Sequence, residues 1–213
     1  MISIVDYGMG NLRSVSKAFE TQGYAAHITS SPDEIRNANG LVLPGVGAFG
    51  ECMANLERHG LVEPIKEYIS SGRPFLGICL GFQILFETSE ESPGVSGLGH
   101  FKGKVVRFPD FGEKRIKVPQ MGWNRINFQP GSPVLNNIPE GTWFYFVHSY
   151  YVDPVDPQVQ AASVTHGSQT VTAAIARDNL TAVQFHPEKS STAGLQILDN
   201  FVQQLTPKTS VAA

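Results

Sequence analysis

Residues 74–83, Pro-Phe-Leu-Gly-Ile-Cys-Leu-Gly-Phe-Gln, contain the pattern that decides the fold. The apolar first half of this stretch predicts a buried parallel strand, and residues 80–86 predict the start of a helix. A single cysteine, Cys79, lies at the turn between them, flanked by Gly77 and Gly81. A sharp strand-to-helix turn of this kind holds its side chain in a strained position, and small neighbours let the backbones approach each other.

Two features of this turn favour a reactive thiol at Cys79. The N-terminus of the following helix would point at the sulfur, and its partial positive charge favours thiolate over thiol. A lone cysteine in such a position is a candidate nucleophile. The alternative, on the residues of the turn alone, is an inert cysteine in the core, where free cysteines are common.

The length and composition of the chain are those of one compact domain. Its 213 residues carry a net charge of −3 and are 41% hydrophobic, which is enough for a sizeable core. We expect the domain to span 1–205 and a flexible tail to follow at 206–213. The charge gives no reason to expect nucleic acid or an anionic membrane as a partner. No segment resembles a membrane span or a secretory signal, so we expect a cytoplasmic protein.

The first part of the chain alternates strands with helices. Apolar runs predict strands at 2–5, 24–28, 41–43 and 75–78, and helical spacing predicts helices at 12–19, 49–58 and 61–69. A capping box at Ser31-Pro32-Asp33-Glu34 predicts a further helix start. This alternation predicts a parallel sheet with helices on its faces.

The second part of the chain has a different pattern. A polar, glycine-rich loop at 89–99 is followed by short β runs at 105–108, 123–128, 143–147, 161–165, 171–175 and 182–185. Few helices interrupt these runs, which favours antiparallel strands added to the sheet. A last amphipathic helix is predicted near 195–205.

A base for the candidate nucleophile is found far along the chain. His186 and Glu188 directly follow the apolar run at 182–185. His186 could take the thiol proton and return it to a leaving amine, while Glu188 could bond the other ring nitrogen and fix its tautomer. Either residue alone is more simply explained as a strand-end histidine or a solvated acid. Together with Cys79 they indicate a nucleophile, a base and a group that orients the base.

Donors for a developing oxyanion are predicted from two segments. The backbone N–H of Leu80 follows the nucleophile directly. The segment 44–47, Pro-Gly-Val-Gly, ends another predicted strand at the edge where open α/β sheets bind ligands, so Val46 and Gly47 could supply a second donor. An ordinary glycine-proline turn is the alternative for this segment.

Other kinds of site have weaker signals. Gly8 and Gly10 follow a strand, but Arg13 occupies the third glycine position of a dinucleotide fingerprint. Six dispersed histidines and two distant cysteines show no metal-ligand spacing, so we expect no metal. His148 is a second candidate base, although no carboxylate follows it closely.

These residues resemble the class I (triad) glutamine amidotransferases, and the similarity covers essentially the whole chain. The segments 77–83 and 186–188 resemble the nucleophile and His/Glu motifs of that family. The segments 7–14 (Tyr-Gly-Met-Gly-Asn-Leu-Arg-Ser), 44–47 and 121–124 (Met-Gly-Trp-Asn) are similar to one branch, the glutaminase subunits of imidazole glycerol phosphate synthase.

The resemblance implies a fold and a reaction. The fold is a flavodoxin-like three-layer α/β/α sandwich whose mostly parallel central sheet carries added antiparallel strands. The reaction is hydrolysis of glutamine to glutamate and ammonia without a cofactor. Cys79 would form a γ-glutamyl thioester, His186 would protonate the departing ammonia and then activate water, and Glu188 would orient His186. The glutamine would be held by side chains of Gln83 and Glu91 and by the backbone of Ser149 and Tyr150.

The resemblance also implies a protein partner. Ammonia released into water becomes ammonium and loses its nucleophilicity, so it must pass directly to an acceptor site. The implied partner is HisF, a (β/α)8 cyclase that makes imidazole glycerol phosphate and an aminoimidazole carboxamide ribotide in histidine biosynthesis. The candidate residues for the face that meets HisF are Asn11, Arg13, Trp123 and Lys189. Trp123 could equally be a core residue.

Other functions remain open on the sequence. A glutaminase could feed another acceptor, such as a pyridoxal phosphate synthase or an anthranilate system, but segments 44–47 and 121–124 speak against this. The same fold also occurs in cysteine proteases and in catalytically silent regulatory domains. A redox thiol protein is disfavoured because no resolving cysteine lies near Cys79.

Overall fold

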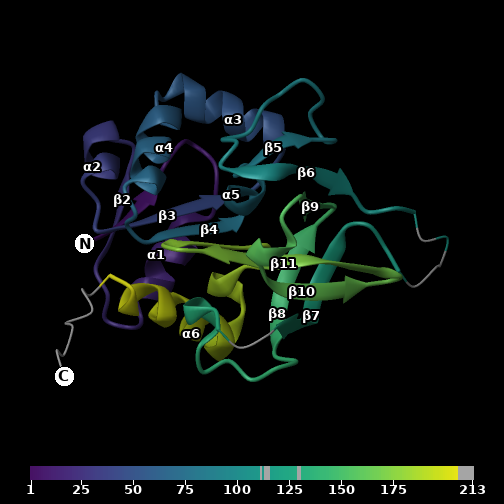
Figure 1. Ribbon diagram of the computed structural model, residues 1–213. Helices are drawn as coiled ribbons and strands as arrows, with labels where there is room; N and C mark the ends of the chain where they lie inside the picture. The colour runs from purple at the N-terminus through teal and green to yellow at the C-terminus, as the bar shows by residue number, and fades with distance from the viewer. Residues whose placement is uncertain (111, 113–115, 129–130, 206–213) are drawn as a thin grey trace.

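The computed structural model describes residues 1–110, 112, 116–128 and 131–205 (Figure 1). The strands are β1 (Ile2–Val5), β2 (Ala26–Thr29), β3 (Gly40–Gly45), β4 (Phe75–Cys79), β5 (Phe86–Ser89), β6 (Phe101–Arg107), β7 (Gln120–Phe128), β8 (Trp143–His148), β9 (Tyr150–Pro154), β10 (Gln160–His166), β11 (Gln169–Arg177) and β12 (Leu180–Val183). The helices are α1 (Leu12–Glu20), α2 (Pro32–Arg36), α3 (Phe49–Arg58), α4 (Val62–Ser70), α5 (Leu80–Gln83) and α6 (Ser191–Gln203). Short 3₁₀ turns are η1 (Pro133–Leu135), η2 (Pro157–Val159) and η3 (Pro187–Lys189). The expected tail at 206–213 lies outside the described residues.

A nine-stranded sheet forms the centre of the molecule, in the order β2-β1-β3-β4-β12-β11-β10-β7-β8. The strands β2, β1, β3, β4 and β12 pair in parallel, and β11, β10, β7 and β8 extend the sheet with antiparallel pairs. The predicted α/β sheet with added antiparallel strands is therefore confirmed. The sequence pattern groups the run at 182–185 with the antiparallel strands, but β12 pairs in parallel with β4, which places the end of β12 beside the end of the nucleophile strand.

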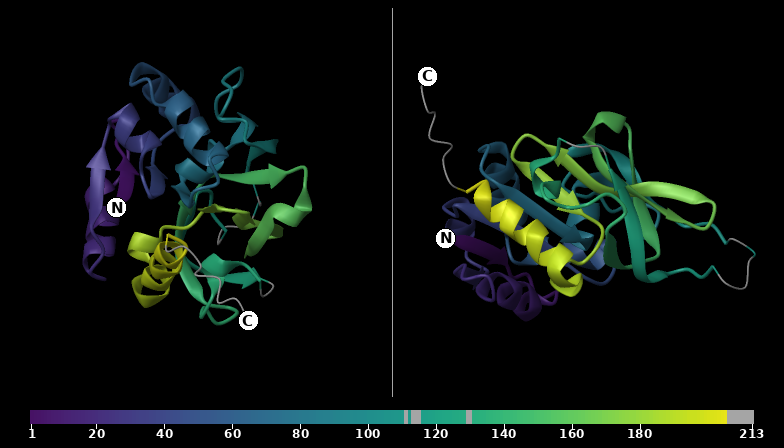
Figure 2. Two further views of the ribbon diagram at one scale, coloured as in Figure 1. Left: turned by 60° about the vertical axis from the view of Figure 1, so that its left-hand side comes forward. Right: turned by 90° about the horizontal axis from the view of Figure 1, so that it is seen from below.

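Helices cover both faces of the parallel part of the sheet (Figures 1 and 2). On one face, α2, α3 and α4 pack on alternate strand residues such as Val5, Leu43 and Phe75, all fully buried. On the other face, α1 and α6 pack on the intervening residues, such as Ile4 and Val42. Successive strand side chains point to opposite faces, so strands that are apolar at every position require this three-layer arrangement.

The chain after the nucleophile differs from the sequence prediction. The helix predicted at 80–86 ends at Gln83, and a strand, β5, begins at Phe86. The carbonyls of Ile84 and Leu85 accept hydrogen bonds from the N–H groups of Leu98 (2.7 Å) and Phe101 (3.0 Å), so the helix does not continue. β5, β6 and β9 form a separate three-stranded sheet, and the sequence pattern does not predict β9.

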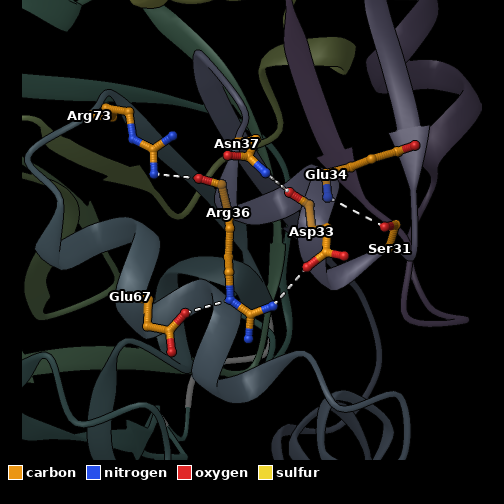
Figure 3. Close-up of polar contacts among 7 residues, drawn as sticks. All are labelled: Ser31, Asp33, Glu34, Arg36, Asn37, Glu67 and Arg73. Carbon is orange, nitrogen blue, oxygen red and sulfur yellow. Dashed lines mark hydrogen bonds and ion pairs between the residues drawn. The ribbon is translucent and has the colours of Figure 1, made fainter.

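The predicted capping box forms the start of α2 (Figure 3). The Ser31 hydroxyl accepts a hydrogen bond from the N–H of Glu34 at 3.4 Å. At the end of this helix the Arg36 guanidinium contacts Glu67 of α4 at 2.6 Å and Asp33 at 3.3 Å. Arg73 donates to the Arg36 carbonyl at 2.5 Å. These contacts hold α2 against α4 and the chain that leads into β4, although exposed ion pairs add little stability by themselves.

Candidate active site

Cys79 is the last residue of β4 and is held in an uncommon backbone conformation. Its φ is 55° and its ψ is −109°, a region that residues other than glycine rarely adopt. β4 lies between β3 and β12, and Cys79 is in register with Gly45 of β3. The strained turn places the buried sulfur in the wall of a pocket at the carboxyl edge of the parallel strands, as the sequence predicted for a strand-to-helix elbow.

Glycines allow the elbow to pack against the neighbouring strand. A β-carbon placed on Gly81 would lie 1.8 Å from the Leu43 carbonyl oxygen, and one on Gly45 would lie 2.9 Å from the β-carbon of Leu80. Both distances are too short for any larger residue. The small residues around Cys79 therefore bring β3 next to the nucleophile, which is the close approach that the glycine pattern indicated.

The short length of α5 changes the expected electrostatics of the nucleophile. Only residues 80–83 are helical, so the aligned peptide dipoles are few and their partial charge is smaller than the sequence suggested. A stronger positive group must therefore accompany the thiolate. The structure supplies it in His186, which lines the same pocket as Cys79.

His186 and Glu188 form a buried hydrogen-bonded pair. Nδ1 of His186 lies 2.8 Å from Oε1 of Glu188, and their side chains are only 3% and 2% exposed. The backbone N–H of His186 donates to the carbonyl of Tyr145 at 2.9 Å. The Ser190 hydroxyl donates to the His186 carbonyl at 2.6 Å and accepts from the N–H of Tyr145 at 3.0 Å. The backbone of His186 is thus fixed to β8, while Glu188 sets the orientation of the ring.

The environment of His186 favours its protonated form. Burial alone would lower its pKa, but interactions with the Cys79 sulfur and the Glu188 carboxylate outweigh burial and raise the pKa to about 10. Among the described residues Nε2 has no hydrogen-bond partner, and it belongs to a ring that lines the same pocket as the Cys79 sulfur. At neutral pH His186 is therefore an imidazolium in the pocket that also holds the Cys79 sulfur. A positive group beside a cysteine favours its reactive form as a nucleophile.

Two glutamines connect the elbow to β12, and the sequence reasoning gave a role to only one of them. The fully buried Gln184 donates to the Cys79 sulfur at 3.8 Å. Gln83, a predicted substrate-binding residue, donates to Oε1 of Gln184 and to the carbonyl of Tyr150, both at 3.0 Å. Gln184 and His186 are two residues apart near the end of β12, so strand periodicity could have indicated that both face the nucleophile.

A pocket of about 300 Å³ brings the predicted catalytic, oxyanion and substrate residues together. Its lining comprises Val46, Gly47, Cys79, Leu80, Gln83, Glu91, Pro119, Val147, His148, Ser149, Tyr150 and His186. Gly47 has a φ of +95°, a conformation that favours glycine, and Val46 is 40% exposed at the mouth. Of the predicted catalytic group, only Glu188 does not line the pocket, and it contacts His186 from behind.

Several lining groups already have internal partners. The Glu91 carboxylate accepts from the N–H of Phe49 at 2.8 Å, at the start of α3. The Ser149 carbonyl accepts from the N–H of Phe108 at 3.0 Å. These bonds fix the pocket wall and leave one carboxylate oxygen of Glu91 for a ligand. His148 also lines the pocket, but burial lowers its pKa to about 4, so it is a much weaker base than His186.

The candidate partner residues lie outside the pocket. Asn11 and Arg13 are exposed at the start of α1, Lys189 is exposed in η3, and Trp123 of β7 is 49% exposed, which resolves it as a surface residue. The Trp123 ring packs edge-on against Tyr145 at 6.2 Å, and the Lys189 ammonium lies 5.8 Å from the same ring. α1 also contacts η3, so these residues border one surface next to His186.

Two further residues, to which the sequence reasoning gave no role in the site, support segment 44–47. The Tyr7 hydroxyl, fully buried, donates to the Pro44 carbonyl at 2.9 Å and accepts from the Cys52 thiol at 3.4 Å. Burial raises the pKa of Cys52 to about 12, so this second cysteine stays a thiol. Cys52 and Cys79 are both free. Cys52 is therefore a structural residue.

Two other kinds of feature are absent from the part of the chain that the structure describes. No group of three or more His, Cys, Asp or Glu side chains there could hold a metal ion. Within the same residues, no helix is both long and apolar enough to cross a membrane.

Comparison with known proteins decides which family has this site. The family described as glutamine amidotransferase class-I matches residues 3–205. The chain belongs to the class-I glutamine amidotransferase family. The resemblance inferred from the motifs is confirmed, and the chain is a glutamine amidotransferase enzyme whose Cys79, His186 and Glu188 occupy one edge of the sheet.

The similar proteins indicate one branch of the glutamine amidotransferase family. "Imidazole glycerol phosphate synthase subunit HisH" from Nostoc punctiforme is 56% identical over 209 residues, covering 98% of each chain. The protein of the same name from Trichodesmium erythraeum is 56% identical over 213 residues, covering 100% of this chain and 98% of the relative. This is the branch to which segments 7–14, 44–47 and 121–124 were similar.

Solved structures agree on the fold. PurLQS from Thermotoga maritima superposes with a TM-score of 0.74 at 19% identity, covering 96% of this chain and 98% of that one. A glutamine amidotransferase from the same organism gives a TM-score of 0.60 at 16% identity, covering 96% of this chain and 83% of that one. Similarity at this level supports the flavodoxin-like α/β/α fold of the glutamine amidotransferases.

Proposed function

We propose that this chain is the glutaminase subunit of an imidazole glycerol phosphate synthase. The observation that supports it most is the joint placement of Cys79 and His186 in one pocket, with Glu188 at 2.8 Å behind the imidazole. The full-length similarity to proteins named HisH selects this branch over glutaminases that feed other acceptors.

The geometry supports a two-step hydrolysis of glutamine. The Cys79 thiolate attacks the side-chain amide carbon, and the oxygen of the tetrahedral intermediate meets N–H donors of Leu80 and of the Val46–Gly47 segment. The imidazolium of His186 gives its Nε2 proton to the amide nitrogen, the C–N bond breaks, and ammonia leaves a γ-glutamyl thioester. Neutral His186 then takes a proton from water as the hydroxyl attacks the thioester, which releases glutamate and restores the thiolate–imidazolium pair.

The remaining polar groups of the pocket fit the other end of glutamine. The free oxygen of Glu91 faces a substrate that carries an ammonium group, and such a charged hydrogen bond adds both affinity and orientation. Gln83, held by Gln184 and Tyr150, and the backbone of Ser149 and Tyr150 form the neighbouring wall. These four residues are the substrate-binding set of this proposal.

The released ammonia passes to a HisF cyclase subunit in the cytoplasm. Ammonia must remain unprotonated until it attacks. The site of glutamine hydrolysis therefore has to lie next to the partner, so that ammonia reaches the acceptor site without entering bulk water. The surface bordered by Asn11, Arg13, Trp123 and Lys189 fits a partner face, because it joins a half-exposed tryptophan to two cations next to the site. Tryptophan and arginine are enriched where protein interfaces have their strongest contacts.

The test compares two nitrogen sources in the complex with HisF. Cys79→Ser should abolish product formation from glutamine and leave product formation from an added ammonium salt intact. Cys52→Ala is the matched control, because its buried thiol bonds Tyr7 and does not line the pocket, and it should retain both activities. Continued use of glutamine by Cys79→Ser, or the absence of any complex with HisF, would refute the proposal.

A further inference from the structure

Three buried polar atoms next to the catalytic pocket have no hydrogen-bond partner among the described residues. They are Oε1 and Nε2 of Gln120 and Nε2 of His148. The two residues are only 3% and 6% exposed. Leaving a buried donor or acceptor unsatisfied is unfavourable, and three such atoms in one place indicate a missing partner.

The sheet register brings these atoms together. Gln120 of β7 is directly opposite His148 of β8, so their side chains lie on the same face, where Phe144, Phe146 and Ile126 are also buried. The other face of the same hairpin exposes Met121 and Trp123. Gln120 and His148 are therefore neighbours on the inner face of the β7–β8 hairpin.

This pair adjoins the place where ammonia would be released. His148 lines the pocket that also contains Cys79 and His186, and so does Pro119, the residue before Gln120. A molecule bound between Gln120 and His148 would lie beside the pocket, against the hairpin that exposes Trp123.

The protonation state of His148 defines what it can bind. Nδ1 lies 2.8 Å from the Tyr150 carbonyl and must carry its hydrogen, because a carbonyl only accepts. Burial, with smaller contributions from the charges of His166 and His186, lowers the pKa of His148 to about 4. The ring is neutral at physiological pH, and its Nε2 is an acceptor that has no proton to give to a base such as ammonia.

We infer that Gln120 and His148 form a binding site for one small neutral molecule, which is water at rest and ammonia during turnover. Ammonia would donate to Nε2 of His148 and Oε1 of Gln120, and its lone pair would accept from Nε2 of Gln120. All three unsatisfied atoms would then be paired. Ammonium has no lone pair for the Gln120 donor and loses more solvation on burial, so the site favours the nucleophilic form.

This inference rests on the proposed function, because it needs ammonia to leave the pocket toward a partner. The first test measures coupling in the complex with HisF, as glutamate released per molecule of product. Gln120→Leu removes both amide atoms and should keep glutamate release within about twofold of wild type. Glutamate released without product should rise by at least about fivefold, because two hydrogen bonds are lost and a single one has about that effect. Burying leucine in place of an unpaired amide should not prevent folding.

Two control variants sharpen the coupling experiment. Gln120→His retains one donor and one acceptor and should restore coupling. Gln203→Leu makes the same substitution at an exposed position of α6 and should leave coupling unchanged. Unchanged coupling in Gln120→Leu would overturn the inference, whereas a wild-type complex that makes no product from glutamine would refute the proposed function instead.

The second test needs no partner. A crystal structure of the wild-type chain should show density for one molecule within hydrogen-bond distance of Nε2 of His148 and the amide of Gln120. Direct bonding of the two side chains to each other, with no density between them, would overturn the inference.

Discussion

Glu188→Gln removes one negative charge from the site while preserving the size of the side chain. In the structure Oε1 of Glu188 lies 2.8 Å from Nδ1 of His186, and both side chains are almost fully buried. A hydrogen bond to a charged group contributes about 1.5–3 kcal/mol, and each 1.36 kcal/mol changes a rate tenfold. If that bond is what sustains the imidazolium, kcat should fall by about 10- to 150-fold.

The assay is glutamate release by the complex, with alkylation of Cys79 by iodoacetamide as a second readout. Alkylation reports the thiolate without requiring substrate, and it should slow in Glu188→Gln because the neighbouring imidazole loses positive charge. Glu63→Gln is the matched control, since Glu63 is 72% exposed and contacts the exposed Lys66 at 3.6 Å. That control should behave as wild type in both assays.

A small effect would refute this reasoning. If Glu188→Gln changed both rates by less than about twofold, the range of an ordinary surface substitution, then the charge on Glu188 would not sustain the imidazolium. The carboxylate would then have only a packing role, and the buried pair at 2.8 Å would have no catalytic meaning.

Three further predictions test the elbow, its support and the charge of the base. Gly81→Ala should lower the free energy of unfolding, measured with denaturant, by more than about 3 kcal/mol, because its β-carbon would lie 1.8 Å from the Leu43 carbonyl oxygen. In the control, Gly60→Ala, the β-carbon would enter open space, and the positive φ alone should lower the free energy of unfolding by about 1 kcal/mol. Tyr7→Phe should lower kcat about fivefold with KM for glutamine nearly unchanged, because the Pro44 carbonyl loses one hydrogen bond; an effect on KM alone would contradict this. The raised pKa of His186 should stabilise the fold fully below its ordinary value of 6.5, progressively less as the pH rises, and not at all above about 10. The difference in Tm between wild type and His186→Gln should therefore shrink from pH 6 to pH 10, and a difference that grew with pH would disprove the assignment.

The sequence predicted the part of the fold that depends on local pattern. Apolar runs and the Ser31 cap located most strands and helices of the parallel half, and the glycines around Cys79 indicated the elbow. The predicted length of α5 was wrong, because the carbonyls of Ile84 and Leu85 bond to a segment near residue 100 rather than to their own helix. Bonds of that range leave no signal in a short window of sequence.

The candidate site also contains residues that the sequence could predict and residues that it could not. Cys79, His186 and Glu188 could be predicted because each follows a recognisable strand end. Tyr7 and Gln120 could not, because their importance comes from a partner or a missing partner across the fold. The sequence shows neither that the Tyr7 hydroxyl bonds Pro44 nor that the Gln120 amide has no hydrogen-bond partner among the described residues.

The central claim is that the sulfur of Cys79 and the imidazole of His186 act together on glutamine. It is tested most directly by mass spectrometry of the chain after reaction with a glutamine analogue that alkylates active-site thiols. One adduct should form, it should map to Cys79 and not to Cys52, and it should form much more slowly in His186→Ala. An adduct on another residue, or equal labelling of Cys79 in the presence and absence of the imidazole, would contradict the account.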